Sequence, residues 1–257
     1  MPQNEHRATS RVLDILEMLS SSNSGYTLTE IAKQINAPKC SIFPIIHTLE
    51  ERHYISLEEH SGKYRIGISA FAVGSTYFNS ESILNHIENA MNELVSVCDE
   101  TCSMGVLNGG NVLYVAKIDS PQSLRLVTHV GKKIPANCTA LGKALLSRTS
   151  LEEMEDIFPK EMLSCTRYSI TNLNKFYEQV SKVDEEGYAY ENQEFAEQII
   201  CIAVPVVKDG KILFAISVSI PSFRYDSKKM LTVKNELKKL KLRLELLLRN
   251  YNGDILI

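Results

Sequence analysis

The stretch NAPKCSIFPIIHTLEERHYI, residues 36–55, decides the fold of the N-terminal region. Four of its apolar residues lie at helical spacing, within about 60° of the first of them at 100° per residue: Ile42, Ile45, Ile46 and Leu49. The opposite side holds polar residues and one proline: Cys40, Pro44, His47 and Glu51. The pattern predicts a helix that buries one face and offers the other to a partner.

Pro44 is unusual in such a helix, because an interior proline has no amide to donate and its ring clashes with the preceding turn, at a cost of ~3 kcal/mol. The missing amide would leave the carbonyl of Cys40 unpaired. Pro44 lies near the helix start on the exposed side, where a bend absorbs part of the clash. We therefore expect a continuous but kinked helix from Lys39. The alternative is a turn over residues 39–43 and a helix that begins at Pro44.

The neighbouring segments predict a winged helix-turn-helix. A first helix is expected to be capped by Thr9 or Ser10 and to end at SSSNSG. A second helix begins with TLTE, residues 27–30, which has the pattern of a capping box, and the turn NAP joins it to the third. YISLE and KYRIG then alternate around Ser61-Gly62 as a hairpin. Three helices followed by a hairpin is the element order of that DNA-binding motif.

The rest of the chain indicates an α+β domain behind a connecting helix. ISAFAVGSTYFN, residues 68–79, is expected to be a linker helix. Two later pairs of apolar segments, joined by NGG and KDGK, predict antiparallel hairpins, and LRLVTHV, residues 124–130, is expected to be a further strand. The expected domains are residues 1–67, 68–79 and 80–257.

Composition and charge narrow the class of protein. The chain is 44% hydrophobic and 23% charged, and no apolar run approaches the roughly 20 residues of a membrane span. The start, MPQNEHRATS, lacks the apolar core of a secretory signal, so a cytoplasmic location is expected. The six scattered cysteines predict free thiols, and neither a metal nor a cofactor is expected. Residues 1–70 hold seven Lys/Arg against eight Asp/Glu, so DNA binding must depend on the local placement of charge.

Several separated motifs resemble the isocitrate lyase regulator (IclR) family of bacterial transcription factors. They are TLTEIAKQINAPKCSIFPIIHTLEERHYI, GKYRIG, GKKIPANCTALGKALL, EEGYAYENQE, CIAVPV and ISVSIPSFR, and the resemblance runs from about Arg7 to Leu248. It implies a winged helix-turn-helix, a linker helix and a GAF-like effector-binding domain with an antiparallel sheet, assembled as homodimers or homotetramers on double-stranded operator DNA. Such a protein is a repressor or an activator, not an enzyme, and it responds to a small molecule, often an organic acid.

The expected DNA contacts lie on the third helix and in the wing. A recognition helix reads the major groove with its N-terminal residues, which here are Lys39, Cys40, Ser41, Phe43 and His47. In the wing, Lys63 and Arg65 are expected to meet backbone phosphates. The alternatives are packing at the domain edge for Phe43 and a merely solvated position for His47, Lys63 and Arg65. Pro44 is expected in the middle of the DNA-facing side, where family members often carry a polar or basic residue, so its neighbours carry the readout.

The effector is expected where PANCTALG enters a short helix, because the free amides at a helix N-terminus attract an anion. The resemblance places the backbone amides of Ala140 and Leu141 against the carboxylate of the effector. It assigns four further residues to the pocket wall: Glu191, where the family often has Asp, Cys201, Ser217 and Ser219. The two serines share one face of their strand, and buried hydroxyls need partners that a ligand can supply. Lys143 suits an anion, but one turn inside its helix it is alternatively an exposed residue.

Three other functions stay open from the residues alone. A thiol hydrolase would draw on His129, Cys138 and Cys201, although no nucleophile motif with a base at diagnostic spacing is present. A DNA-binding regulator with a thiol or metal switch would use the close pair Cys98 and Cys102. A winged helix used for protein contact would suit the slightly acidic N-terminal region.

Overall fold

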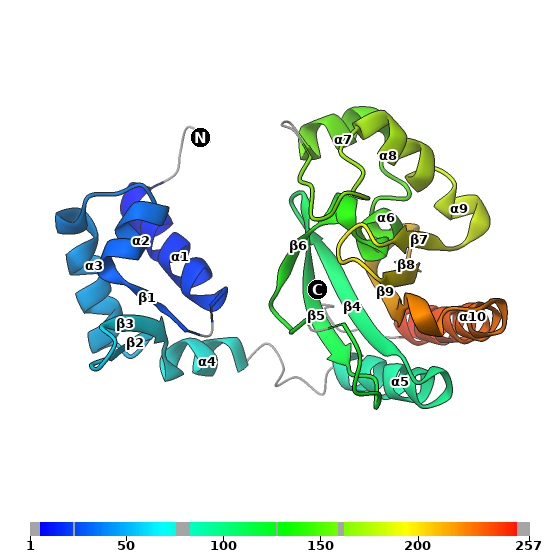
Figure 1. Cartoon of the computed structure of the whole chain (residues 1–257), viewed down its shortest axis with the longest axis horizontal. Helices are drawn as coiled ribbons and strands as arrows, with labels where there is room; N and C mark the ends of the chain where they lie inside the picture. The colour runs from blue at the N-terminus through cyan, green and yellow to red at the C-terminus, as the bar shows by residue number, and fades with distance from the viewer. Residues whose placement is uncertain (1–5, 23, 76–82, 127, 159–161, 251–257) are drawn as a thin grey trace. The chain divides into compact units, whose positions relative to one another are not determined.

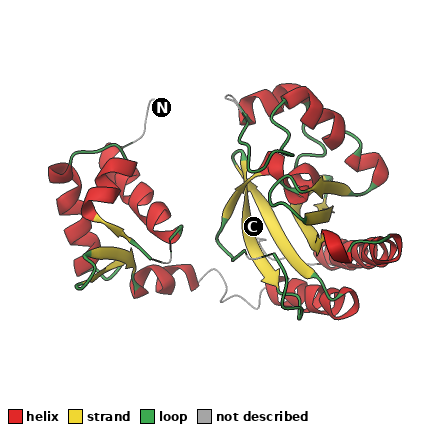
Figure 2. Ribbon diagram, in the orientation of Figure 1, coloured by secondary structure: helices red, strands yellow, loops and turns green. Residues whose placement is uncertain are grey.

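The computed structural model describes residues 6–22, 24–75, 83–126, 128–158 and 162–250 (Figure 1). The chain separates into two compact units, Met1–Ser82 and Ile83–Ile257. Helices dominate the first unit, and a sheet with helices around it makes up the second (Figure 2).

The first unit is a winged helix-turn-helix, as the sequence predicts. Its three helices are α1 (Arg7–Ser20), α2 (Leu28–Gln34) and α3 (Lys39–Glu51). Its antiparallel sheet, in the order β1-β3-β2, is made of β1 (Tyr26–Thr27), β2 (Ile55–Glu58) and β3 (Lys63–Ile66). The expected capping box is present: the Thr27 hydroxyl accepts from the Glu30 amide at 3.3 Å, and the Glu30 carboxylate accepts from the Thr27 amide at 2.7 Å.

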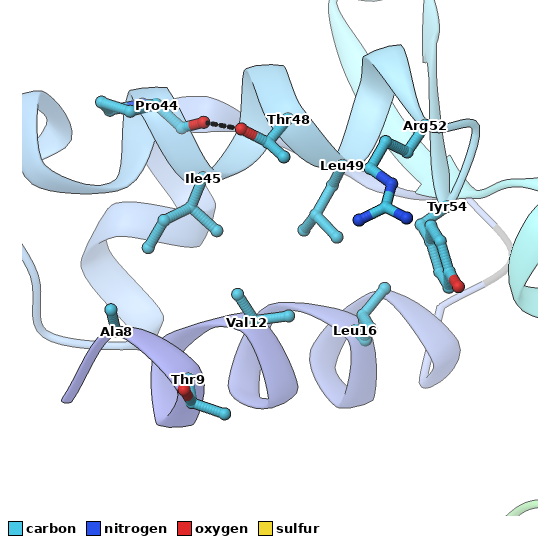
Figure 3. Close-up of a pocket in the computed structure, with 10 residues that line it drawn as sticks. All are labelled: Ala8, Thr9, Val12, Leu16, Pro44, Ile45, Thr48, Leu49, Arg52 and Tyr54. Atoms are coloured by element: carbon cyan, nitrogen blue, oxygen red, sulfur yellow. Dashed lines mark hydrogen bonds between the residues drawn. The ribbon is translucent and has the colours of Figure 1, made fainter. Parts of the chain in front are cut away.

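Helix α3 runs without interruption through Pro44, from Lys39 to Glu51. The alternative of a helix that begins at Pro44 is therefore wrong, whereas the kink stays a prediction. The Pro44 carbonyl accepts a hydrogen bond from the Thr48 hydroxyl at 2.9 Å (Figure 3). The expected apolar face packs in the core except for Ile45, which is half-buried because it borders an open groove.

Helix α4 (Ile68–Ser75) follows the wing. It is the described part of the expected linker helix, and residues 76–79 lie outside the described residues. None of its side chains is buried, and Ile68, Phe71 and Val73 are among the exposed large apolar residues.

The second unit is built on a six-stranded antiparallel sheet in the order β6-β5-β4-β9-β8-β7. Its strands are β4 (Thr101–Asn108), β5 (Asn111–Ile118), β6 (Lys133–Pro135), β7 (Ala189–Asn192), β8 (Ile199–Lys208) and β9 (Lys211–Pro221). Its helices are α5 (Ile83–Cys98), α6 (Ala140–Leu145), α7 (Leu151–Ile157), α8 (Leu173–Val180), α9 (Val183–Glu186) and α10 (Ser227–Asn250). The α+β class and both expected hairpins, β4–β5 and β8–β9, are confirmed.

The two faces of this sheet carry different layers. Helices α5 and α10 lie side by side and bury one face, with Met91 and Leu237 fully buried in that core (Figure 1). Helix α6 covers the other face, where Leu141 packs with Tyr114 and Ala203, and α7 and α8 join the same layer. The expected effector helix is thus in direct contact with the centre of the sheet.

The expected strand over residues 124–130 is wrong for the part of it that the structure describes. Side chains from elsewhere take up its backbone carbonyls: Arg224 Nη2 donates to Leu124 O at 3.0 Å, and Lys117 Nζ donates to Thr128 O at 2.8 Å. With these carbonyls satisfied by cations, the alternating pattern of the segment does not produce a ladder.

Candidate functional sites

The exposed face of α3 brings most of the expected DNA-contacting residues together. Lys39, Cys40, Phe43 and His47 are all exposed. The Phe43 side chain is 53% exposed and its ring centre lies 6.4 Å from that of His47. The His47 ring also lies near Glu51, with Nδ1 and Oε2 3.5 Å apart. This face offers an aromatic edge, a cation and a group that donates or accepts, which suits contacts in a DNA groove.

Two of the expected contacts are already engaged within the chain. The Ser41 hydroxyl donates to the Pro38 carbonyl at 2.7 Å, which leaves only its lone pairs for a partner. The Arg65 guanidinium donates to Glu58 Oε2 at 3.0 Å across the hairpin. Lys63 is half-buried on the same strand. The other guanidinium hydrogens of Arg65 stay available to a partner, whereas the Glu58 carboxylate offsets part of its positive charge.

An apolar groove of about 520 Å³ lies between α1 and α3 (Figure 3). Val12 and Leu16 of α1 face Ile45 and Leu49 of α3 across it. Pro44 lines the rim of this groove. The expectation that Pro44 occupies the middle of the DNA-facing side is corrected: it lies at the border, because at 100° per residue it points between the directions of the exposed face and the groove.

The second unit gathers the expected effector residues on the sheet face beneath α6. Glu191 on β7 is paired in register with Cys201 on β8, and Cys201 with Ser219 on β9. Residues directly opposite one another in an antiparallel pair share a face, so these side chains form one row. Ser217 follows two residues before Ser219 and points to the same side. All four are buried.

Helix α6 packs on the sheet face that carries this row. Ala140 and Leu141 are its first two residues, and both are buried in the layer that contains Cys201. Thr139 caps the helix by accepting from the Gly142 amide at 2.9 Å. A side chain at Gly142 would collide with the Ala136 backbone, so glycine allows the close approach of the preceding turn.

Glu191 contributes a carboxyl group to this row, and burial raises its pKa. Its Oε1 accepts from the backbone amides of Glu194 and of Phe195, the latter at 3.1 Å. Its Oε2 accepts no hydrogen bond from any residue that the structure describes. Burial raises the pKa of Glu191 to about 7, although the Cys201 thiol and the two amides favour its charged form. The recorded hydrogen bond of that thiol, at 3.3 Å, goes to the Ser219 hydroxyl.

Lys143 is buried, so the alternative of an exposed lysine is wrong. Its ammonium group donates to Glu194 Oε1 at 2.6 Å, Gln179 Oε1 at 2.8 Å and the Tyr190 carbonyl at 2.9 Å. All three ammonium hydrogens are thereby used, which leaves none for an effector. Lys143 instead ties α6 to the segment after β7 whose amides hold Glu191.

Sequence reasoning missed two polar residues of the same face, Thr101 and Ser103 on β4. Thr101 lies opposite Ser219 and Ser103 opposite Ser217 in the β4–β9 pair. The signal was present, because both alternate with Cys102 and Met104 at the period of a strand. Only the register of strands far apart in sequence shows that they join the effector residues.

Cys98, Cys102 and Cys138 lack the environment of a thiol switch or a nucleophile. Cys98 and Cys102 are buried, and burial raises the pKa of the Cys98 thiol to about 11 and that of Cys102 further still. Burial also raises the pKa of Cys138 to about 12, whereas a reactive cysteine needs a lowered one. Across the described ranges, no group of three or more His, Cys, Asp or Glu residues is placed to hold a metal.

Two family models match the chain. Residues 8–58 match the IclR helix-turn-helix domain, and residues 75–244 match the bacterial transcriptional regulator IclR C-terminal domain. The chain belongs to the IclR family.

Curated relatives and solved structures agree with this assignment. The HTH-type transcriptional regulator KdgR of Escherichia coli is 28% identical over 222 residues, which cover 86% of this chain and 84% of that protein. A crystal structure of an IclR transcriptional regulator from Alicyclobacillus acidocaldarius superimposes with a TM-score of 0.83 at 20% identity, covering 95% of this chain and 99% of that one. An IclR homologue from Microbacterium hydrocarbonoxydans, solved with 4-hydroxybenzoate, has a TM-score of 0.76 at 18% identity and coverages of 95% and 100%.

This IclR-family protein is a DNA-binding transcriptional regulator with an effector-binding C-terminal domain. Membership confirms the expectation of a regulator instead of an enzyme, and neither the thiol hydrolase nor the thiol or metal switch is supported. Within the part of the chain that the structure describes, no helix is both long and apolar enough to cross a membrane.

Proposed function

We propose that this regulator reads its operator with the exposed face of α3 and grips the flanking phosphates with the wing. The base-contacting set is Lys39, Cys40, Ser41, Phe43 and His47, and the phosphate contacts come from Lys63 and Arg65. The support is that four of the five helix residues are exposed on one side of a continuous helix. A positive charge at the first turn and an aromatic edge one turn later match what a major groove offers.

The proposed effector is a small carboxylic acid bound between α6 and the sheet. The backbone amides of Ala140 and Leu141 hold its carboxylate, and the wall is formed by Glu191, Cys201, Ser217 and Ser219. The observation that carries this proposal is the buried Glu191 carboxyl, whose Oε2 has no hydrogen-bond partner in the described part of the chain and lies beside a row of small polar side chains. The solved relative from Microbacterium hydrocarbonoxydans holds an organic acid, 4-hydroxybenzoate, which agrees with this class of ligand.

The remaining parts of the proposal concern organisation. The functional division is residues 1–67 for DNA binding, 68–79 for the linker helix and 80–257 for effector binding. The chain acts as a homodimer or homotetramer, since paired wings read paired half-sites. Because its target is genomic DNA, its location is the bacterial cytoplasm.

Fluorescence anisotropy with duplexes that the wild-type protein selects from the genome of its own organism tests both sites. Lys39→Ala and Arg65→Ala should each weaken binding, whereas Lys211→Ala, the same change of charge in the second unit, should not. Ser217→Ala and Ser219→Ala should blunt the response to an active acid and leave DNA binding intact, with the exposed Ser96→Ala as the control. Normal responses in both serine variants would refute the assignment of the effector site.

A further inference from the structure

The sheet face that α6 covers contains buried polar atoms without hydrogen-bond partners among the described residues. Across the described residues, the buried side-chain oxygens that lack a hydrogen-bond partner belong to Ser103, Thr128, Ser147, Glu191 and Glu194. Two of these atoms, Ser103 Oγ and Glu191 Oε2, lie on the sheet face beneath α6. An unpaired buried polar atom is unfavourable, so two of them on one face point to a ligand that pairs with both.

The strand order gives the distance between these two atoms, and that distance sets the length of a ligand that pairs with both. Glu191 lies on β7 and Ser103 on β4, and strands β8 and β9 run between them. Neighbouring strands are about 4.8 Å apart, so the two backbones are roughly 14 Å apart across the sheet. Ser217 lies opposite Ser103, and Ser219 and Cys201 continue the polar surface toward Glu191. A single polar group cannot reach both ends, whereas a chain with polar groups at separate carbons can.

The hydrogen-bonding properties of Ser103 and Glu191 indicate which functional group of the ligand pairs with them. Ser103 has a hydroxyl, which both donates and accepts, and Glu191 accepts when charged and donates when protonated. A hydroxyl group on the ligand is complementary to each of these states, whereas a carbonyl only accepts and an ammonium only donates. Lys117 is the residue opposite Ser103 on β5, but its ammonium group is paired with Asp119 at 2.7 Å and donates to the Thr128 carbonyl, so we assign it no part in selecting the ligand.

We infer that the effector is a carboxylic acid with hydroxyl groups along its chain, and that Ser103 is a specificity-determining residue that pairs with one of them while Glu191 pairs with another. This inference rests on the effector site proposed above and adds the class of acid and one residue to it. The Ser103 hydroxyl has no hydrogen-bond partner among the described residues, so we expect its removal to cost the free protein little.

Isothermal titration calorimetry on the full-length protein tests this with acids matched in carbon number. The pairs are gluconate against hexanoate and ribonate against pentanoate, whose five- and six-carbon chains are long enough to approach both ends of the row. In the pair that fits the site better, we expect the hydroxylated acid to bind about tenfold tighter than the plain acid. The reason is that each well-placed hydrogen bond to a buried group contributes about a factor of ten to the affinity. Ser103→Ala should lower that preference by about tenfold and leave the affinity for the plain acid unchanged.

Thermal melting separates this role from a structural one. Ser103→Ala should leave the melting temperature of the free protein unchanged or raise it, because alanine removes an unpaired hydroxyl. The exposed Ser96→Ala serves as the matched control in both measurements. Glu191→Gln provides a second variant, which should retain hydroxylated acids better than Glu191→Leu because an amide still donates and accepts.

The results of these measurements distinguish the proposed effector site from the preference for hydroxylated acids. If plain acids bind as tightly as their hydroxylated partners, or if Ser103→Ala weakens both members of a pair equally, the effector site stands and this inference is overturned. A clear loss of melting temperature in Ser103→Ala also overturns it. If none of the four acids binds at millimolar concentration, the proposed carboxylate site and this inference fall together.

Discussion

Replacing Lys143 with methionine should strongly destabilise the second unit. The Lys143 side chain is 1% exposed, and its ammonium group makes three hydrogen bonds, one of them an ion pair with Glu194. Methionine occupies most of the volume of the lysine stem, so the cavity term is small. The substitution removes the ion-pair partner of the Glu194 carboxylate, which is itself buried.

The expected magnitude follows from that unpaired carboxylate. Removing one member of a buried ion pair typically costs about 3–5 kcal/mol, because the remaining charge has lost both water and its partner. For a domain of this size each kcal/mol lowers the melting temperature by roughly 2–4 °C, so a fall on the order of 10 °C is expected. Burial already raises the pKa of Glu194 against the effect of Lys143. In the variant this pKa rises further, so the loss of stability should be larger at pH 8 than at pH 5.

The assay is urea unfolding of the full-length chain, followed by circular dichroism and by tyrosine fluorescence, since the chain has 11 tyrosines and no tryptophan. A double-mutant cycle supplies the control: Lys143→Met, Glu194→Met and both together. Replacing both charges by apolar groups should return the free energy of unfolding to within about 2 kcal/mol of the wild type.

Two outcomes would refute this reasoning. A loss below about 1 kcal/mol in Lys143→Met would mean that Glu194 finds water or another donor. A double variant no more stable than the single one would mean that Lys143 acts by its shape and not by its charge.

Further predictions concern the DNA-binding unit and the effector site. Pro44→Ala should stabilise the first unit by about 1–3 kcal/mol in thermal melts, because alanine restores an amide inside α3; a neutral result would show that the helix absorbs proline without cost. Arg65→Ala should weaken binding to a random duplex and lower the slope of log binding constant against log salt concentration by about 1. Glu58→Ala should tighten binding, because Arg65 loses its carboxylate partner. Unchanged anisotropy titrations in both variants would argue against a contact between the wing and DNA. Because the folded-state pKa of Glu191, about 7, lies above its ordinary 4.5, its contribution to stability is present at low pH and lost as the pH rises through this window. Urea unfolding between pH 4 and pH 8 should show this loss in the wild type, and Glu191→Gln should remove it.

Local signals in the sequence were sufficient for α2, α3 and the β2–β3 hairpin of the first unit, but not for β1 or for the start of α1, which begins at Arg7 with His6 as its cap instead of Thr9 or Ser10. The apolar spacing of Ile42, Ile46 and Leu49 predicted α3 and its buried side, and TLTE predicted the start of α2. These features depend on residues three or four positions apart, so the chain carries them without reference to the rest of the fold. The strand expected over residues 124–130 is absent from the described part of this segment for the opposite reason: distant side chains bind the carbonyls of Leu124 and Thr128.

The effector site shows the same division. Sequence alone determined that Ser217 and Ser219 share one side of a strand, and the family motifs placed Glu191 and Cys201 beside them. The sequence by itself did not show that Lys143 is buried or that Ser103 lies on the same face. Those facts depend on the register between β4, β9, β8 and β7 and on the packing of α6 over them. Periodicity tells which side of an element is buried, but only tertiary contacts decide which residues, distant in sequence, meet there.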